Sequence, residues 1–200
     1  MEDYVHLHVH TQYSVLDGQA AVPNLVDKAL RDGMRGMAIT DHGNMMGIKE
    51  FFNYTAKVCG KPKKELKAAR EKLAALEDGT FDTTAGKDGT LPQEGKTTAQ
   101  LIAETRDLIE KQQKIADFKP IFGCEMYVAR RGDKTLKEGK ADQSGWHLVV
   151  LAKNETGYHN LIKLVSRSWV DGFYMPPRTD PMDLEKYHEG LIICSACIGG

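Results

Sequence analysis

Three histidines occupy alternate positions near the start of the chain, at His6, His8 and His10. Side chains of a β-strand alternate between its two faces, so this spacing predicts a strand with all three imidazoles on one face. Several titratable groups on one face are costly unless they bind something, and a metal ion is the simplest partner for them. About thirty residues later, the run Ile39-Thr40-Asp41-His42-Gly43-Asn44 adds an Asp-His pair. Together these segments predict a metal site.

Composition limits the class of protein. The 200 residues are 41% hydrophobic and 28% charged, as in an ordinary globular domain with its own core. The net charge of −1 gives the whole chain no preference for nucleic acid, so such a contact must come from a local patch. No apolar run approaches the roughly 18 residues of a membrane span, and the acidic N-terminus does not resemble a signal peptide.

The cysteines favour a reducing compartment. Cys59, Cys124, Cys194 and Cys197 are scattered, do not form a disulfide framework and predict a cytoplasmic protein. The last two form a C-x-x-C pair, which can be a redox pair or half of a zinc knuckle. No second pair completes a knuckle, and Cys194 ends an apolar run. We therefore expect Cys194 to be a small buried hydrophobe.

Short apolar runs alternate with helical patterns, which predicts an α/β fold built from parallel βα units. The predicted helices are Val22–Asp32, a helix beginning near Gly47, and Tyr158–Ser168. The predicted strands are Tyr4–His8, Met37–Thr40, Pro120–Val128, Leu148–Ala152 and Leu191–Cys194.

Residues 59–117 interrupt this alternation, because a βα connection usually needs only a few residues. We predict an inserted helical hairpin, with helices Lys61–Leu76 and Thr98–Ala116 and a flexible, glycine-rich tip over Glu77–Lys96. Its first helix carries a basic cluster that can touch phosphate. Interleaved Glu65 and Glu71 favour a solvated helix face instead. The cluster consists of Lys61, Lys63, Lys64, Lys67, Arg70 and Lys72.

Polar candidates recur where the predicted strands end, which is where barrel-like α/β enzymes assemble their sites. They are His8, His10, Asp17, Asp41, His42, Glu125 and Cys197. His147 begins its strand, so only a bulge or a reversed strand direction brings it to the others. This mixed donor set suits zinc or manganese, and its size indicates a multinuclear site that acts on a phosphoryl group. His159 and His188 are not expected to be ligands, and His6 is a candidate to orient one.

Several motifs in order resemble the polymerase-and-histidinol-phosphatase (PHP) domain family, especially the form found at the N-terminus of bacterial replicative DNA polymerase III α subunits, the C-family polymerases. The resemblance covers the chain except for residues 59–117. H-L-H-V-H-T and I-T-D-H-G-N are typical of the wider PHP superfamily. G-Y-x-N-L and E-G-L-I narrow the resemblance to the replicative polymerase form. The motifs are H-L-H-V-H-T, I-T-D-H-G-N, G-C-E-M-Y-V, W-H-L-V-V-L-A-K-N-x-T-G-Y-x-N-L, G-F-Y-x-x-P-R and E-G-L-I-x-x-S-x-C-x-G-G.

The resemblance implies a distorted (βα)7 barrel with a trinuclear metal site of zinc or manganese. Asp41 would support this site. The family's last motif, an Asp-x-His, lies further downstream, so residues 1–200 are expected to form a truncated PHP domain lacking two ligands and the final strands. The ligands that the resemblance implies are His8, His10, Asp17, His42, Glu125, His147 and Cys197.

The same resemblance implies a function in DNA replication. The parent protein would be a magnesium-dependent DNA polymerase, and the intact PHP site a phosphoesterase that removes nucleotides 3′–5′ by hydroxide attack at the primer 3′ end. Expected partners are DNA, the remaining polymerase domains, the sliding clamp and the clamp loader, with no membrane. A stand-alone histidinol-phosphatase-type enzyme and a silent structural module of the replisome, with the hairpin as its contact surface, remain alternatives. The G-Y-x-N-L and E-G-L-I segments weigh against the first.

Overall fold

The computed structural model describes residues 4–81 and 96–200, and these residues form two compact units. The core unit comprises the described residues of Met1–Tyr54 and Lys119–Gly200, and the hairpin unit comprises those of Thr55–Phe118. The described residues contain six helices and a mixed sheet of five strands. The helices are α1 (Val22–Arg31), α2 (Ile48–Glu77), α3 (Thr98–Ala116), α4 (Gly139–Asp142), α5 (Glu155–Val170) and α6 (Pro181–Tyr187). The strands are β1 (Gly36–Ile39), β2 (Lys119–Ala129), β3 (Gly145–Ala152), β4 (Arg178–Thr179) and β5 (Leu191–Ser195).

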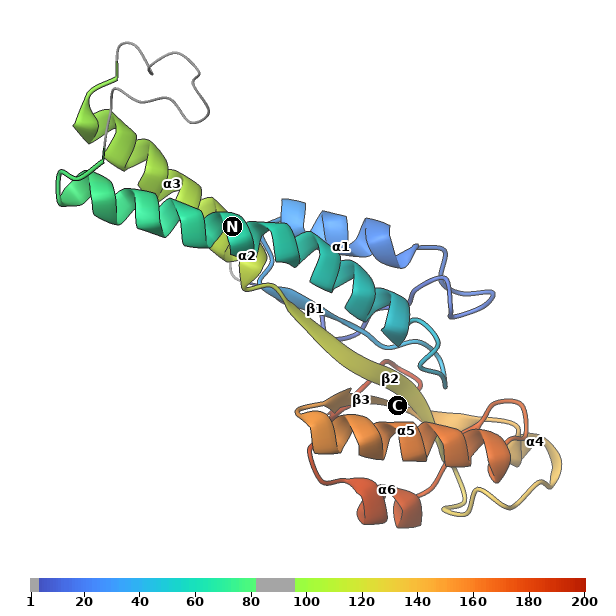
Figure 1. The fold of residues 1–200 in the computed structure, drawn as a ribbon. Coiled ribbons are helices and arrows are strands. Elements are labelled where there is room, and N and C mark those ends of the chain that lie inside the picture. The colour runs from blue at the N-terminus through green and yellow to red at the C-terminus, as the bar shows by residue number, and fades with distance from the viewer. Residues whose placement is uncertain (1–3, 82–95) are drawn as a thin grey trace. The chain divides into compact units, whose positions relative to one another are not determined.

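The long strand β2 organises the sheet of the core unit (Figure 1). One of its edges pairs in parallel with β1 and, near its end, with β4, while its other edge pairs antiparallel with β3. β5 then pairs antiparallel with β3. The α/β class is confirmed, but the expectation of parallel units throughout is wrong. Parallel neighbours are usually joined by a helix that crosses the sheet, whereas residues 130–144 between β2 and β3 contain only the four-residue helix α4.

The two faces of β2 have different roles. Cys124 and Met126 are buried on one face, where they pack with Leu161 and Leu164 of α5. The alternate residues point to the opposite face, and Glu125 is among them. The helix side of the sheet is therefore hydrophobic core, and the other side is free to carry polar side chains.

The predicted first strand, Tyr4–His8, is wrong as a continuous strand, because only His6 makes an isolated parallel bridge, to Met37. The segment nevertheless follows β1, since the amides of Ala38 and Thr40 donate to the carbonyls of His6 and Val9. The Val9 amide donates to the Thr40 hydroxyl at 2.9 Å. A side chain thus replaces a backbone acceptor, and the ladder is interrupted at Val9, between His8 and His10.

Helix boundaries in the core unit follow local chemistry. α1 begins with a proline in its first turn and buries Val22 and Val26. Asn154 caps α5 by accepting a hydrogen bond from the Gly157 amide at 2.9 Å, and Asp180 caps α6 in the same way. The helix predicted near Gly47 is the start of α2, which continues without a break through Pro62 to Glu77.

In the hairpin unit, α3 runs antiparallel to the part of α2 that begins at Thr55. Glu65 contacts Gln112, whereas Glu77, further along α2, pairs with Arg106 at 2.7 Å. A capping box at Thr97 starts α3. Lys61 pairs with Glu65 at 3.4 Å, and its side chain is 83% exposed, as a solvated face requires. Residues 82–95 of the predicted tip lie outside the described residues.

Helices in the described parts of the chain include none long and apolar enough to cross a membrane.

The tight packing of Gly157 gives a test of the fold. A Cβ atom there would lie 1.8 Å from the Gly190 carbonyl oxygen, so we expect Gly157→Ala to lower the free energy of unfolding by about 1–3 kcal/mol. A Cβ at Gly60 in α2 meets open space, so Gly60→Ala should raise it by about 0.5–1 kcal/mol. Urea unfolding measures both changes. A Gly157→Ala variant with an unchanged free energy of unfolding would contradict the close approach of α5 to the turn before β5.

Candidate metal centre

The chain beyond β1 brings His42 beside Glu125. The Glu125 amide donates to the Asp41 carbonyl at 3.1 Å, and the Gly43 amide donates to the Glu125 carbonyl at 2.8 Å. Gly43 has φ +61°, and a Cβ there would lie 2.8 Å from a carbon of Pro177. The Asp-His-Gly sequence therefore has a glycine where the backbone turns and packs tightly.

Glu125 is the centre of the site. Its buried carboxylate lies within hydrogen-bond distance of four imidazoles. Oε2 is 3.0 Å from His8 Nε2, 2.9 Å from His10 Nε2 and 3.1 Å from His42 Nδ1. Oε1 is 2.6 Å from His147 Nδ1. One buried carboxylate thus connects segments that are far apart in sequence.

These contacts favour an ionised Glu125. Burial raises the pKa of its carboxyl, but hydrogen bonds from His10, His42 and His8 outweigh burial and hold the pKa well below its usual range. The hydrogen bond to Glu125 is the main reason why the pKa of His42 is raised, against the opposing effect of burial. The site therefore already holds one negative charge, next to a His42 imidazole whose pKa is raised.

The reversed direction of β3 brings His147 into the site. In the antiparallel register, His147 lies opposite Tyr127, two residues beyond Glu125 on the same face of β2. No bulge is needed. The His147 amide donates to the Gly199 carbonyl at 3.0 Å, and Cys197 Sγ lies 3.3 Å from His147 Nδ1. Cys197 thus joins the site from the segment after β5.

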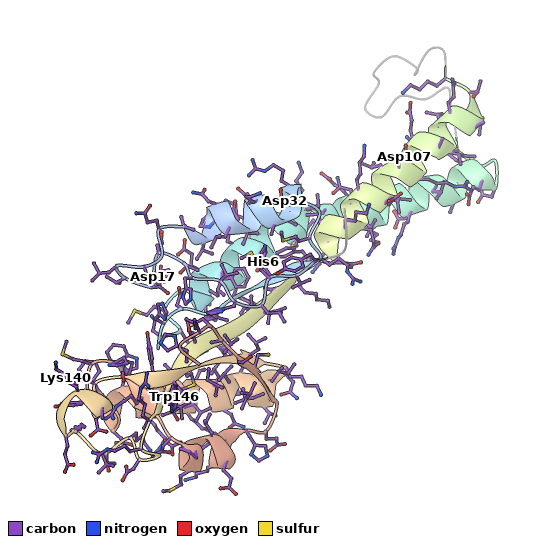
Figure 2. The ribbon with its side chains drawn as sticks, turned by 180° about the vertical axis from the view of Figure 1, so that it is seen from behind. His6, Asp17, Asp32, Asp107, Lys140 and Trp146 are labelled. Carbon is purple, nitrogen blue, oxygen red and sulfur yellow. The ribbon has the colours of Figure 1, made fainter. Side chains whose placement is uncertain are left out.

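Asp17 reaches the site from a tight loop before α1, where Figure 2 labels it. Its Oδ2 lies 3.0 Å from His42 Nε2, and its side chain is 60% exposed. The preceding Leu16 has φ 71°, a left-handed conformation that is unusual for leucine. Gly18 packs against the Thr11 carbonyl so closely that a Cβ would lie 2.0 Å from its oxygen. The loop presents Asp17 at the outer side of the site.

Asp41 supports the site from behind. It is buried and accepts hydrogen bonds from the Thr11 amide at 2.7 Å, the Thr11 hydroxyl at 2.8 Å and the Ser14 hydroxyl at 2.7 Å. Thr11 ends the H-L-H-V-H-T motif, but the sequence patterns indicated no role for Thr11 or Ser14. Hydroxyl residues one and four positions after His10 were the available signal, but the sequence does not show that they meet Asp41.

Ser14 determines which nitrogen of His10 faces the centre. Its single hydroxyl proton goes to Asp41, so its oxygen accepts from the His42 amide at 3.1 Å and from His10 Nδ1 at 3.0 Å. His10 Nδ1 therefore carries a proton, and a neutral His10 directs the lone pair of Nε2 at Glu125 Oε2. Two lone pairs 2.9 Å apart repel unless a proton or a cation lies between them.

The donor atoms fit metal ions. Ligands of a tetrahedral zinc ion lie about 3.4 Å apart, given bonds of about 2.1 Å. The atoms of His8, His10 and Glu125 are separated by 2.9–3.1 Å, close to that spacing. His42 Nδ1 is buried and faces Glu125 Oε2 at 3.1 Å, a position from which both atoms can share a cation. Three groups with suitable spacing share members: His8–His10–Glu125, His10–Asp17–His42 and Glu125–His147–Cys197.

The other histidines and Cys194, which were not predicted to be metal ligands, lie elsewhere in the core unit. His6 is exposed and packs edge-to-face against Tyr4 at 4.7 Å between ring centroids. His159 is exposed on α5, and His188 Nδ1 contacts the Glu185 carbonyl. Cys194 is partly buried and packs against a small cluster that includes Val149. All four cysteines are free thiols.

The family of the chain follows from comparison with known proteins. The model of the PHP domain family matches residues 6–200, so the chain belongs to the PHP domain family. It is 35% identical over 197 residues to the DNA polymerase III subunit alpha of Borreliella burgdorferi, with 98% of this chain and 12% of that protein covered.

Other similar proteins have the same description. The chain is 34% identical over 197 residues to the DNA polymerase III subunit alpha of Treponema pallidum, and the alignment covers 98% of this chain and 12% of that protein. It is 32% identical over 204 residues to the DNA polymerase III subunit alpha of Aquifex aeolicus, and that alignment covers 100% of this chain and 13% of that protein. The chain thus spans about an eighth of the length of these curated relatives.

The shared members of the three groups predict unequal effects of substitution. His10 belongs to two groups and Asp17 to one. We therefore expect His10→Ala to lower the number of bound Zn²⁺ or Mn²⁺ ions by about two and Asp17→Ala by about one. Elemental analysis after gel filtration measures this, with His159→Ala as the matched histidine control. If His10→Ala and His159→Ala lowered the number of bound metal ions equally, His10 would not be a shared metal ligand.

The position of Asp41 predicts an indirect effect. Asp41→Ala removes both oxygens that accept from Thr11 and Ser14, so the Ser14 hydroxyl, and with it His10, loses its fixed orientation. We expect affinity for Zn²⁺ to fall by about 10–100-fold with the number of ions unchanged. Competition with a chromogenic chelator measures the affinity. A lost equivalent of metal would instead make Asp41 a ligand.

Proposed function

We propose that this chain is the N-terminal PHP domain of a DNA polymerase III α subunit, and that its metal centre hydrolyses phosphodiesters as a 3′–5′ proofreading exonuclease. The observation that carries the proposal is the convergence of donor groups on Glu125. Its carboxylate is the common member of two of the three groups that are suited to a metal ion. Membership of the PHP family, and relatives described as DNA polymerase III subunit alpha, support the setting in replication.

The proposed ligands divide among three divalent cations, for which zinc and manganese suit the nitrogen, oxygen and sulfur donors. When bound, such ions neutralise charge on a phosphodiester and make water a stronger nucleophile. The chain contributes the positions. His10 and Glu125 each connect two sets of ligands, and Ser14 with Asp41 orients His10. Asp17 and Cys197 lie on the exposed side, where a strand end has access. The proposed ligands are His8, His10, Asp17, His42, Glu125, His147 and Cys197.

The setting of this domain is also proposed. We infer that residues 1–200 belong to a distorted (βα)7 PHP barrel, that residues 59–117 are an insertion in it, and that the rest of the protein is a magnesium-dependent polymerase. DNA, with the primer 3′ end at the centre, is the proposed substrate. The sliding clamp and the clamp loader are proposed partners. The cytoplasmic location stays a prediction.

The proposal is tested on the intact protein that carries this chain. With Mn²⁺ or Zn²⁺ we expect release of the mismatched nucleotide from a primer 3′ end, and at least a hundredfold loss in the His8→Ala/His10→Ala double variant. His159→Ala/His188→Ala is the matched control. Unchanged release in the first double variant would assign the activity elsewhere. Full metal binding without release would favour a structural module.

A further inference from the structure

An exposed aromatic pair lies next to the metal centre. Trp169, in the last turn of α5, stacks on Phe173 with ring centroids 5.4 Å apart and an angle of 15° between the rings. Each side chain is 43% exposed. Exposed apolar side chains that lie together are typical of interaction sites, whereas single ones are ordinary. The site described above does not use either ring.

Hydrogen bonds connect this pair to the centre. The Trp169 indole nitrogen donates to the Gly43 carbonyl at 2.7 Å, and Gly43 directly follows the candidate ligand His42. The Tyr127 ring also lies beside Gly43, 3.5 Å from where a Cβ would be, stacks on His42 at 6.0 Å and meets His147 edge-on at 5.0 Å. Gly43 therefore contacts both the exposed pair and a ring that packs on two candidate ligands.

The loop that carries Phe173 is held in place. Arg178 is fully buried, and its guanidinium donates to the carbonyls of Gly172, Lys134 and Leu136. A Cβ at Gly172 would lie 1.9 Å from the Arg178 carbonyl oxygen, so only glycine fits there. Met175 adopts φ 47° and is 75% exposed. The loop keeps a strained, apolar residue at the surface, which is typical of a ligand contact.

We propose that Trp169 and Phe173 form a stacking platform for the bases of a single DNA strand whose 3′ end lies at the metal centre. This inference rests on the proposed function and adds the form of the substrate. Stacking on aromatic rings is tolerant of sequence, as an enzyme that removes any terminal nucleotide requires. The pair needs no basic neighbours, because the proposed cations at the centre hold the phosphate.

The first experiment reads the contact without catalysis. An oligonucleotide with 5-iodouracil at its 3′ end, and a phosphorothioate as its last linkage to block hydrolysis, is bound to the intact metal-loaded protein and irradiated, which joins the base to an aromatic ring stacked on it. Mass spectrometry should find the base on Trp169 or Phe173. Cross-links that appear only on other parts of the protein would overturn the proposal, and the pair would then be a docking site for a protein.

The second experiment separates binding from chemistry. Phe173→Ala should raise KM for a mismatched single-stranded 3′ end about tenfold and leave kcat within about twofold. Hydrolysis of bis(p-nitrophenyl) phosphate, which is too small to reach the platform, should not change. Trp169→Phe retains a ring for stacking but loses the hydrogen bond to the Gly43 carbonyl, so its KM should lie between those of the wild type and Phe173→Ala. Phe52→Ala removes a similarly exposed ring (50%) elsewhere on the core unit and serves as the control.

The outcomes distinguish failure of the platform from failure of the exonuclease. Nucleotide release with a wild-type KM in Phe173→Ala would overturn the platform and leave the proposed function intact. No nucleotide release in the wild type, together with cross-links at Trp169 or Phe173, would overturn the exonuclease and keep the strand contact. A fall in kcat without a change in KM would mean that Phe173 acts by supporting His42, which also contradicts the platform.

Discussion

The burial of the Glu125 carboxylate is the constraint on which this structure depends. An ionised carboxylate without partners is too costly to bury, so its position requires positive or hydrogen-bonding groups on every side. Imidazoles from three different parts of the core unit meet this need. Each of them must be held in place in turn, which explains the buried hydrogen bonds of Asp41 and Ser14. Fold and site therefore stabilise one another.

The sheet makes this arrangement possible because β2 separates two environments. Its Cys124 and Met126 side anchors α5 in a close-packed core, and its Glu125 side carries the polar groups. Neighbours that approach β2 from opposite edges reach the same carboxylate. His42 arrives from the β1 edge, and His147 from the β3 edge. A rigid hydrophobic layer behind such a site keeps its donor atoms at spacings that suit a metal.

Much of this organisation was predictable from local patterns. The helices around Val22, Gly47 and Tyr158 follow from hydrophobic periodicity, and the structure has α1, α2 and α5 there. The Asp-His-Gly run follows the end of β1, and its His42 lies beside Glu125. The prediction of a strand at Tyr4–His8 was wrong. Alternating histidines are compatible with a strand, but they do not show whether the backbone amides of the segment find carbonyl acceptors on a neighbouring strand. Here the Val9 amide donates to the Thr40 hydroxyl instead.

The amino-acid order alone decides which chemistry is present, since imidazole, carboxylate and thiol groups are properties of residues and the helices follow from short-range periodicity. The folded chain decides which of these groups meet. The antiparallel course of β3 brings His147 to Glu125, and the loop before α1 brings Asp17 to His42 while His6 stays at the surface. Those pairings depend on contacts between residues far apart in sequence, and no local pattern encodes the direction in which a strand returns.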